Sequence, residues 1–291
     1  MIIKNPLNYT GSKDRIMEQL LENFDYSKGT FIDFFAGSGV VGVNVADKFR
    51  RVILNDGCWQ IVELLKAIYE DKDFINKVDK VIATYNLSKE NKDEFLELRE
   101  LYNENFKDED KFRADILYAL ITHAFNYFAV FTKDDRFSVP SGKGRSSFNS
   151  NIRKKLENYI KAMEDKDLEF YSFKQEDFIN VIKDTYNEDE INSVMFYFDP
   201  PYSCSDAVNR SYGLKWNEGD DLRLMDFCDW LNENGASFTL SNVLENNGKE
   251  NKRMKEWAKK YNVVPVSLDY NNCHYQRKNV GETKEVIIKN F

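Results

Sequence analysis

The sequence predicts an α/β fold, a Rossmann-like and mainly parallel sheet interrupted by a mainly helical insertion. Three observations predict it. A strand-like segment, a glycine-rich turn, a helix-like segment and a second strand-like segment follow one another within residues 30–54. Short apolar segments recur after residue 165. Between these two regions, apolar residues recur at helical spacing.

The first unit of the sheet begins with residues 30–35, whose apolar side chains are typical of a buried strand. The glycine turn at residues 37–42, Gly-Ser-Gly-Val-Val-Gly, ends that strand, and residues 43–49 are expected to be helical. Residues 51–54 are predicted as the next strand, which ends at Asn55-Asp56. This order of elements begins a doubly wound sheet.

The middle of the chain is predicted to be an inserted helical domain at residues 66–165, so that residues 1–65 and 166–291 form a discontinuous sheet domain. Phe95, Leu98 and Tyr102 illustrate the helical spacing. Residues 132–150 are rich in Ser, Gly and Asn and are expected to form a loop or ribbon. The later elements are expected to be a helix at 150–163, strands at 168–173, 194–198, 236–240, 263–268 and 284–289, and helices at 221–233 and 249–260.

Composition limits the class of protein. The chain has 291 residues, of which 42% are hydrophobic, which suffices for one large core or for one domain with an insertion. Four scattered cysteines and two histidines have no metal-ligand spacing, so neither a metal site nor disulfides are expected. No segment approaches the length of a membrane span, and the N-terminus is unlike a signal peptide. The expected location is the cytoplasm.

The net charge of −8 argues against a uniformly basic nucleic-acid-binding surface. Positive charge is nevertheless concentrated between residues 133 and 155, where the basic residues are opposed only by Asp134 and Asp135. Contacts with phosphate groups need such local positive charge. The basic residues of this stretch are Lys133, Arg136, Lys143, Arg145, Arg153, Lys154 and Lys155.

The segment Asp199-Pro200-Pro201-Tyr202 follows the apolar run at 194–198. Consecutive prolines fix φ twice and remove two backbone donors. The Asp199 carboxylate and the Pro200 carbonyl are therefore two acceptors beside the aromatic ring of Tyr202. This group suits a planar ring that carries an NH2 group, such as an adenine or cytosine taken out of its stack. The simpler alternative is a rigid turn with a solvated aspartate.

Other segments favour an adenosine-containing cofactor. The glycine turn fits the G-x-G-x-x-G pattern, and Asp56 follows it at the spacing expected of a carboxylate that binds ribose hydroxyls. This pattern does not separate NAD from S-adenosylmethionine, and a tight packing turn without a ligand is the alternative. Lys13 precedes a predicted helix and could pair with a carboxylate, or it could be a solvated lysine. Asp177 could accept from an adenine amino group, or it could cap a helix.

Together these segments resemble the Dam-type (alpha-group) site-specific DNA adenine-N6 methyltransferases, in which a target-recognition segment lies between the cofactor and catalytic motifs. The resemblance covers essentially the whole chain, including residues 8–13, 31–39, 55–56, 176–178, 199–202 and 281–288. It implies a methyltransferase sheet that uses S-adenosylmethionine, with Asp199, Pro200, Pro201 and Tyr202 as catalytic residues. The cofactor-binding residues that it implies are Tyr9, Lys13, Asp33, Gly37, Gly39, Asp56, Asp177, Phe178 and Asp199.

The same resemblance implies that double-stranded DNA is the substrate, contacted by Lys133, Arg136, Lys143, Arg145 and Arg153. It also implies a restriction-modification, phage or mobile-element context, a cognate restriction endonuclease and a monomeric enzyme. The segment at 136–143 is similar to the family pattern, but the segment at 128–133 departs from it, so the target sequence does not transfer. The alternatives are methylation of cytosine N4 or of RNA, an NAD-dependent oxidoreductase, and a DNA-binding regulator with an inactive methyltransferase fold.

Overall fold

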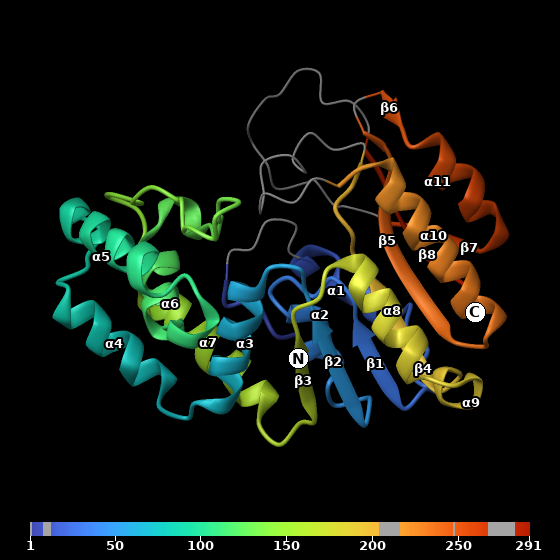
Figure 1. The fold of residues 1–291 in the computed structure, drawn as a ribbon, viewed down its shortest axis with the longest axis horizontal. Helices are drawn as coiled ribbons and strands as arrows, with labels where there is room; N and C mark the ends of the chain where they lie inside the picture. Colours follow the sequence, from blue (N-terminus) through green and yellow to red (C-terminus); the bar gives the residue numbers. More distant parts are fainter. Residues whose placement is uncertain (1, 8–12, 204–215, 247, 267–282) are drawn as a thin grey trace.

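The computed structural model describes residues 2–7, 13–203, 216–246, 248–266 and 283–291 (Figure 1). Its centre is an eight-stranded sheet of order β3-β2-β1-β4-β5-β8-β7, with β6 paired to β5. The strands are β1 (Thr30–Asp33), β2 (Arg51–Asn55), β3 (Leu168–Tyr171), β4 (Val194–Phe198), β5 (Ser237–Asn246), β6 (Lys249–Glu250), β7 (Asn262–Pro265) and β8 (Thr283–Lys289). Strands β1 to β5 pair in parallel, which confirms the predicted Rossmann-like α/β fold.

One end of the sheet differs from a purely parallel arrangement. Strand β8 lies between β5 and β7 and is antiparallel to both. Strand β5 is also longer than the predicted 236–240, because its second half pairs with β8 and β6 beyond the last residue that it pairs with β4. The apolar pattern locates each strand, but the direction of a strand depends on its neighbours in the sheet.

Helices cover both faces of the sheet (Figure 1). Strand β4 is buried along its whole length, and its side chains alternate between two cores. Met195 and Tyr197 belong to one core, whereas Phe196 and Phe198 belong to the other. Helices on the first face are η1 (Lys13–Arg15), α1 (Met17–Leu21), α2 (Val40–Val45), α3 (Trp59–Glu70) and α7 (Ser150–Met163), and those on the second are α8 (Gln175–Thr185), α9 (Glu188–Ile191), α10 (Glu218–Glu233), α11 (Lys252–Trp257) and η5 (Ala258–Lys260).

The inserted region is helical, and it lies beyond the β3 edge of the sheet (Figure 1). Its central helix is α6 (Ala114–His123), whose residues are all buried and which packs against α3, α4 and α5. The remaining elements are α4 (Phe74–Thr84), α5 (Lys92–Asn105), η2 (Glu109–Lys111) and η3 (Phe125–Tyr127). The predicted boundary at residue 65 falls inside α3, which contacts both β3 and α6, and the division into two domains stays a prediction.

No helix in the described parts of the chain has both the length and the apolar character needed to cross a membrane. In the long loop after η3, residues 131 and 137 form an isolated antiparallel bridge. We call residues 131–137 the recognition hairpin, because the predicted DNA-binding residues Lys133 and Arg136 belong to it.

Candidate active site

The carboxyl ends of β1, β2, β3 and β4 meet at one edge of the sheet, because these strands are parallel. Asp33 ends β1, Asn55 ends β2 and is followed by Asp56, and Asp199 follows β4 directly. Residues from three of the predicted motifs are therefore brought to the same edge. Tyr9 lies outside the described residues.

Lys13, Asp199 and Tyr202 form a closed triangle of polar contacts. The Lys13 Nζ lies 2.7 Å from Asp199 Oδ2 and donates a hydrogen bond of 2.9 Å to the Tyr202 hydroxyl. That hydroxyl donates in turn to Asp199 Oδ1 at 2.9 Å. Burial and the nearby Asp199 raise the pKa of Tyr202 well above its usual value, so the phenol keeps its proton. The two motifs that contribute these residues thus form a single site.

Glu285 is a fourth member of this site that the sequence did not indicate. On β8, Val286 and Ile288 join one core and Ile287 the other, so Glu285 lies on the face of Ile287 and Tyr197. Burial and the neighbouring Asp199 raise the pKa of Glu285, while Lys13 and a hydrogen bond with Tyr202 lower it. An acidic residue directly before the apolar residues 286–288 of the strand was the available signal.

The glycine turn has the conformation that its pattern predicts. Gly37 and Gly39 have φ values of 51° and 67°, in the left-handed region that favours glycine. At Gly42, an added Cβ would lie 2.2 Å from the Leu54 side chain, so that glycine allows α2 to pack on β2. The Gly37 N–H donates to Asp56 Oδ2 at 2.8 Å, which joins the turn to the end of the next strand.

Asp33 and Asp56 are carboxyl groups whose surroundings disfavour charge. Asp33 is 1% exposed, and burial raises its pKa well above the usual value, with further raising by Asp199 and Asp56. Its Oδ2 accepts from the Gly42 N–H at 3.2 Å, while its Oδ1 has no hydrogen-bond partner among the described residues. Burial also raises the pKa of Asp56, against two backbone hydrogen bonds that lower it. The unpartnered Asp33 oxygen can therefore take part in binding a ligand at this edge.

The segment after β3 is held in place by Asn55. Its side-chain amide donates to the carbonyls of Phe34 and Phe173, and its oxygen accepts from the Phe173 N–H at 2.9 Å. Helix α8 follows, with Asp177 exposed in its first turn. Phe178 is buried in the core, where its ring lies 4.9 Å from that of Phe34. Phe178 therefore packs against other aromatic rings and supports the turn that carries Asp177.

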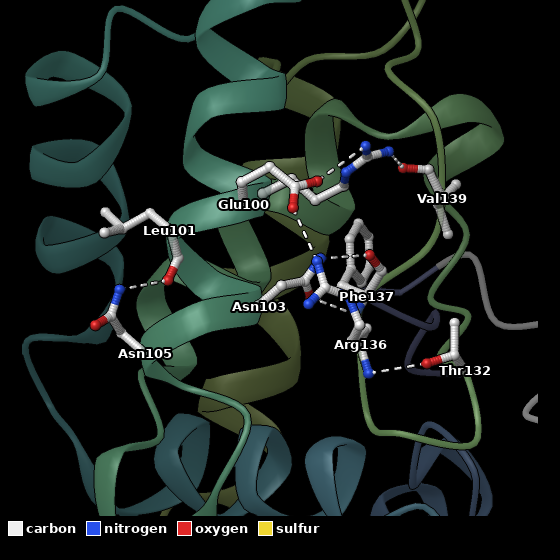
Figure 2. Close-up of polar contacts among 9 residues, drawn as sticks. Glu100, Leu101, Asn103, Asn105, Thr132, Arg136, Phe137 and Val139 are labelled. Carbon is white, nitrogen blue, oxygen red and sulfur yellow. Dashed lines mark hydrogen bonds and ion pairs between the residues drawn. The ribbon is translucent and has the colours of Figure 1, made fainter.

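The predicted DNA-binding residues differ in their surroundings. Lys133, Lys143 and Arg145 are exposed. Arg136 forms an ion pair of 2.9 Å with Glu100 of α5 (Figure 2). Arg153 pairs with Asp79 and lies over the ring of Phe148. Within the described residues, no cluster of His, Cys, Asp and Glu could hold a metal ion.

The recognition hairpin is anchored on α5 by Asn103 (Figure 2). The Asn103 side chain, 2% exposed, accepts from the Phe137 N–H at 2.7 Å and donates to the Phe137 carbonyl at 3.1 Å. An amide that satisfies both backbone groups of one residue acts as a substitute strand partner. The tip of the hairpin, which carries Lys133 and Arg136, is therefore presented on a fixed base.

A doubly wound sheet with a glycine turn, a carboxylate at the end of β2 and an Asp-Pro-Pro-Tyr segment after β4 defines the class of Rossmann-like methyltransferases. Comparison with known families gives the particular group. The chain belongs to the D12 class N6 adenine-specific DNA methyltransferase family, whose model matches residues 9–272. This confirms the resemblance seen in the sequence.

Individual relatives agree with the family. The chain is 34% identical over 294 residues to the type II methyltransferase M.FokI of Planomicrobium okeanokoites and 33% identical over 300 residues to the modification methylase StsI of Streptococcus sanguinis. It is 25% identical over 293 residues to the modification methylase LlaI of Lactococcus lactis subsp. lactis. Each alignment covers 99% of this chain and 43% of the relative, so the chain spans less than half the length of these proteins.

Proposed function

We propose that this protein transfers a methyl group from S-adenosylmethionine to the N6 amine of an adenine in double-stranded DNA at a specific sequence. The observation that carries the proposal is the triangle of Lys13, Asp199 and Tyr202 at the carboxyl edge of the sheet. The match to an adenine-specific family favours adenine over cytosine N4 or RNA. An NAD-dependent oxidoreductase would leave the Asp-Pro-Pro-Tyr segment without a role.

The residues at the sheet edge fit S-adenosylmethionine. Positive φ values at Gly37 and Gly39 allow a ligand to approach the backbone, and Asp56 after β2 would bind ribose hydroxyls. The unpartnered oxygen of Asp33 and the exposed carboxylate of Asp177 are further polar contacts for the methionine and adenine ends. When bound, the cofactor supplies a sulfonium methyl group that is already activated for transfer.

The chemistry that remains for the protein is to make the adenine amine a better nucleophile. Its lone pair is delocalised into the ring, and acceptors for its two hydrogens favour a tetrahedral nitrogen. Asp199 and the Pro200 carbonyl supply those acceptors, with Lys13 and Tyr202 holding the orientation of the Asp199 carboxylate. The Tyr202 ring stacks on the flipped base. Positioning and electrostatics are sufficient for this reaction.

The basic residues of the insertion would contact DNA. Lys133 and Arg136 on the recognition hairpin, with Lys143, Arg145 and Arg153, would combine phosphate and base contacts. We propose a monomeric enzyme of a restriction-modification, phage or mobile-element system that acts beside a cognate endonuclease, since relatives are named as modification methylases. A cytoplasmic location is consistent with the buried free thiols of Cys58 and Cys228.

The test is methyl transfer from labelled S-adenosylmethionine to unmethylated genomic DNA, followed by digestion to nucleosides and by single-molecule sequencing. We expect N6-methyladenine at one short recurring sequence. The Asp199→Ala variant should bind DNA and lose transfer. Label in N4-methylcytosine or in RNA would overturn the proposed substrate, and normal transfer by Asp199→Ala would overturn the assigned site.

A further inference from the structure

A chain of hydrogen bonds links the end of β2 to the tip of the recognition hairpin. The Cys58 N–H donates to Asp56 Oδ1 at 2.9 Å, and the Cys58 thiol donates to Gln60 Oε1 at 3.4 Å. The amide nitrogen of Gln60 then donates to Asp135 Oδ1 at 2.8 Å. Asp56 itself accepts from the Gly37 N–H, so the chain begins at the proposed cofactor site.

Gln60, the central residue of this chain of hydrogen bonds, is buried. Gln60 lies in the first turn of α3 and is 1% exposed. A buried amide without partners is destabilising, whereas both ends of the Gln60 amide are paired. Burial, Asp56 and Asp135 together raise the pKa of the Cys58 thiol, so Cys58 keeps the proton that it donates.

Asp135, at the far end of these hydrogen bonds, has an unusual backbone conformation. Asp135 has a φ of 59°, in the left-handed region that few residues other than glycine adopt. Its N–H donates to the Thr132 carbonyl at 3.1 Å, which closes the turn of the hairpin. Lys133 lies two residues before Asp135, and Arg136 follows it directly. The contact with Gln60 therefore fixes the tip that carries the candidate DNA contacts.

The hairpin thus has two anchors with different connections. Asn103 and Glu100 of α5 hold its Phe137 end and have no part in the cofactor site. Gln60 of α3 holds its tip and is linked through Cys58 to Asp56. A change in the mobility of Asp56 can therefore be transmitted through Cys58 and Gln60 to the tip of the recognition hairpin.

We propose that Gln60 is a positioning residue that couples occupancy of the cofactor site to DNA binding by the recognition hairpin. This inference rests on the proposed function. A cofactor that binds Asp56 restrains Asp56 and Cys58, and the restrained Gln60 amide favours the DNA-binding position of Asp135. Because coupling between two binding sites is reciprocal, DNA must tighten cofactor binding by the same factor.

The experiment measures that factor in the whole protein. Dissociation constants for a fluorescein-labelled duplex, carrying the sequence methylated in genomic DNA, are determined with and without S-adenosylhomocysteine. Dissociation constants for S-adenosylhomocysteine are determined by calorimetry with and without the duplex. The coupling factor is the dissociation constant of one ligand without the other ligand divided by its dissociation constant with the other ligand present. For the unmodified protein we expect a coupling factor of about fivefold or more, equal for DNA and for S-adenosylhomocysteine.

Variants separate coupling from simple support of the fold. Gln60→Met keeps the side-chain length and removes both hydrogen bonds, and Asp135→Gly removes the acceptor at a residue where glycine tolerates the positive φ. Both variants should reduce the factor to less than twofold. The matched control is Asn103→Ala, which loosens the other anchor. It should weaken DNA binding similarly with and without S-adenosylhomocysteine and leave the factor unchanged.

The outcomes are distinct. A factor below twofold in the unmodified protein, or an unchanged factor in Gln60→Met and Asp135→Gly, overturns the coupling role while leaving the proposed function intact. An equal loss of coupling in Asn103→Ala would assign Gln60 a purely structural role and overturn the inference. Failure of the unmodified protein to bind either ligand would reject the proposed function and the inference with it.

Discussion

The ammonium group of Lys13 lies 2.7 Å from the Asp199 carboxylate, and this ion pair joins the start of the chain to the segment after β4. The Lys13 side chain is 7% exposed and that of Asp199 is 19% exposed. Removing one partner of a buried pair is strongly destabilising, because it leaves an uncompensated charge. Lys13 also has Asp33 and Glu285 in its electrostatic neighbourhood, so it is the cation that balances several carboxyl groups.

Lys13→Met should therefore lower kcat/KM for methyl transfer by about 100-fold or more, since misplacement of a catalytic group by about 1 Å can cost about that much. Without the ammonium group, Asp199 lies among other carboxyl groups and loses its fixed orientation. Steady-state kinetics with a labelled cofactor gives the ratio. The control is Lys72→Met, which removes an exposed lysine. Equal activity of the two variants would contradict the role of Lys13.

Tyr202 has a hydroxyl group and a ring with separable roles. Tyr202→Phe removes the hydrogen bonds to Lys13 and Asp199 but keeps the stacking surface. Without the hydroxyl the Asp199 carboxylate is held less firmly, and we expect a loss of roughly 10-fold in kcat, which is about 1.4 kcal/mol. Tyr202→Ala should lose a further 10-fold or more, because stacking on a base is worth about 1–3 kcal/mol. Equal rates in the two variants would show that the ring does not contact the base.

Asp33 makes the stability of the protein depend on pH. Because burial raises its pKa well above 3.8, the folded state keeps a proton that the unfolded chain releases. This contribution is complete below pH 3.8 and is lost as pH rises through the folded-state pKa. Relative to Asp33→Asn, the unmodified protein should lose about 1.4 kcal/mol per pH unit in that window.

Urea unfolding of both proteins across a pH series tests the Asp33 prediction. The free-energy difference between them should grow with pH in favour of Asp33→Asn. The exposed Asp226 supplies a control variant, Asp226→Asn, which should follow the pH dependence of the unmodified protein. A constant difference between Asp33→Asn and the unmodified protein would mean that Asp33 ionises normally in the folded state.

Two asparagines of α5 form a matched pair (Figure 2). Asn103→Ala leaves the buried N–H and carbonyl of Phe137 without partners and should destabilise the protein by about 2–4 kcal/mol. Asn105 is exposed and bonds the Leu101 carbonyl within its own helix, so Asn105→Ala should change stability by less than about 0.5 kcal/mol. Denaturant unfolding compares them, and equal effects would exclude an anchoring role for Asn103.

The salt dependence of DNA binding should distinguish the basic residues of the hairpin. Lys133 is exposed, whereas Arg136 is paired with Glu100. Lys133→Ala should reduce the slope of log K against log salt by about 1, which is the loss of one phosphate contact. Glu100→Gln should strengthen DNA binding, because it releases Arg136. A weaker complex of Glu100→Gln with DNA would place Arg136 away from the phosphates.

Local signals in the sequence were enough for the parallel part of the sheet, strands β1 to β5, and for its carboxyl edge. Apolar runs identified the strands, and glycine and proline marked the turns at residues 37–42 and 199–202, because their backbone restrictions act within a few residues. The parallel order then follows from strands separated by helices, which brings Asp56 and Asp199 to one edge. The family followed from the order of these segments.

Only the tertiary structure decided how the side chains pair. The contacts of Lys13 with Asp199 and of Gln60 with Asp135 join distant parts of the chain, and neither residue type nor spacing specifies them. The position of Glu285 depends on β8 lying between β5 and β7, and the burial of Phe178 depends on the packing of α8. The sequence by itself determined the fold class, since local backbone preferences and apolar periodicity act along the chain, and the resemblance of its motifs indicated the family. Packing decided which carboxyl groups of the site are charged and which side chains pair with one another, since burial and ion pairing between distant residues arise only when helices and strands pack together.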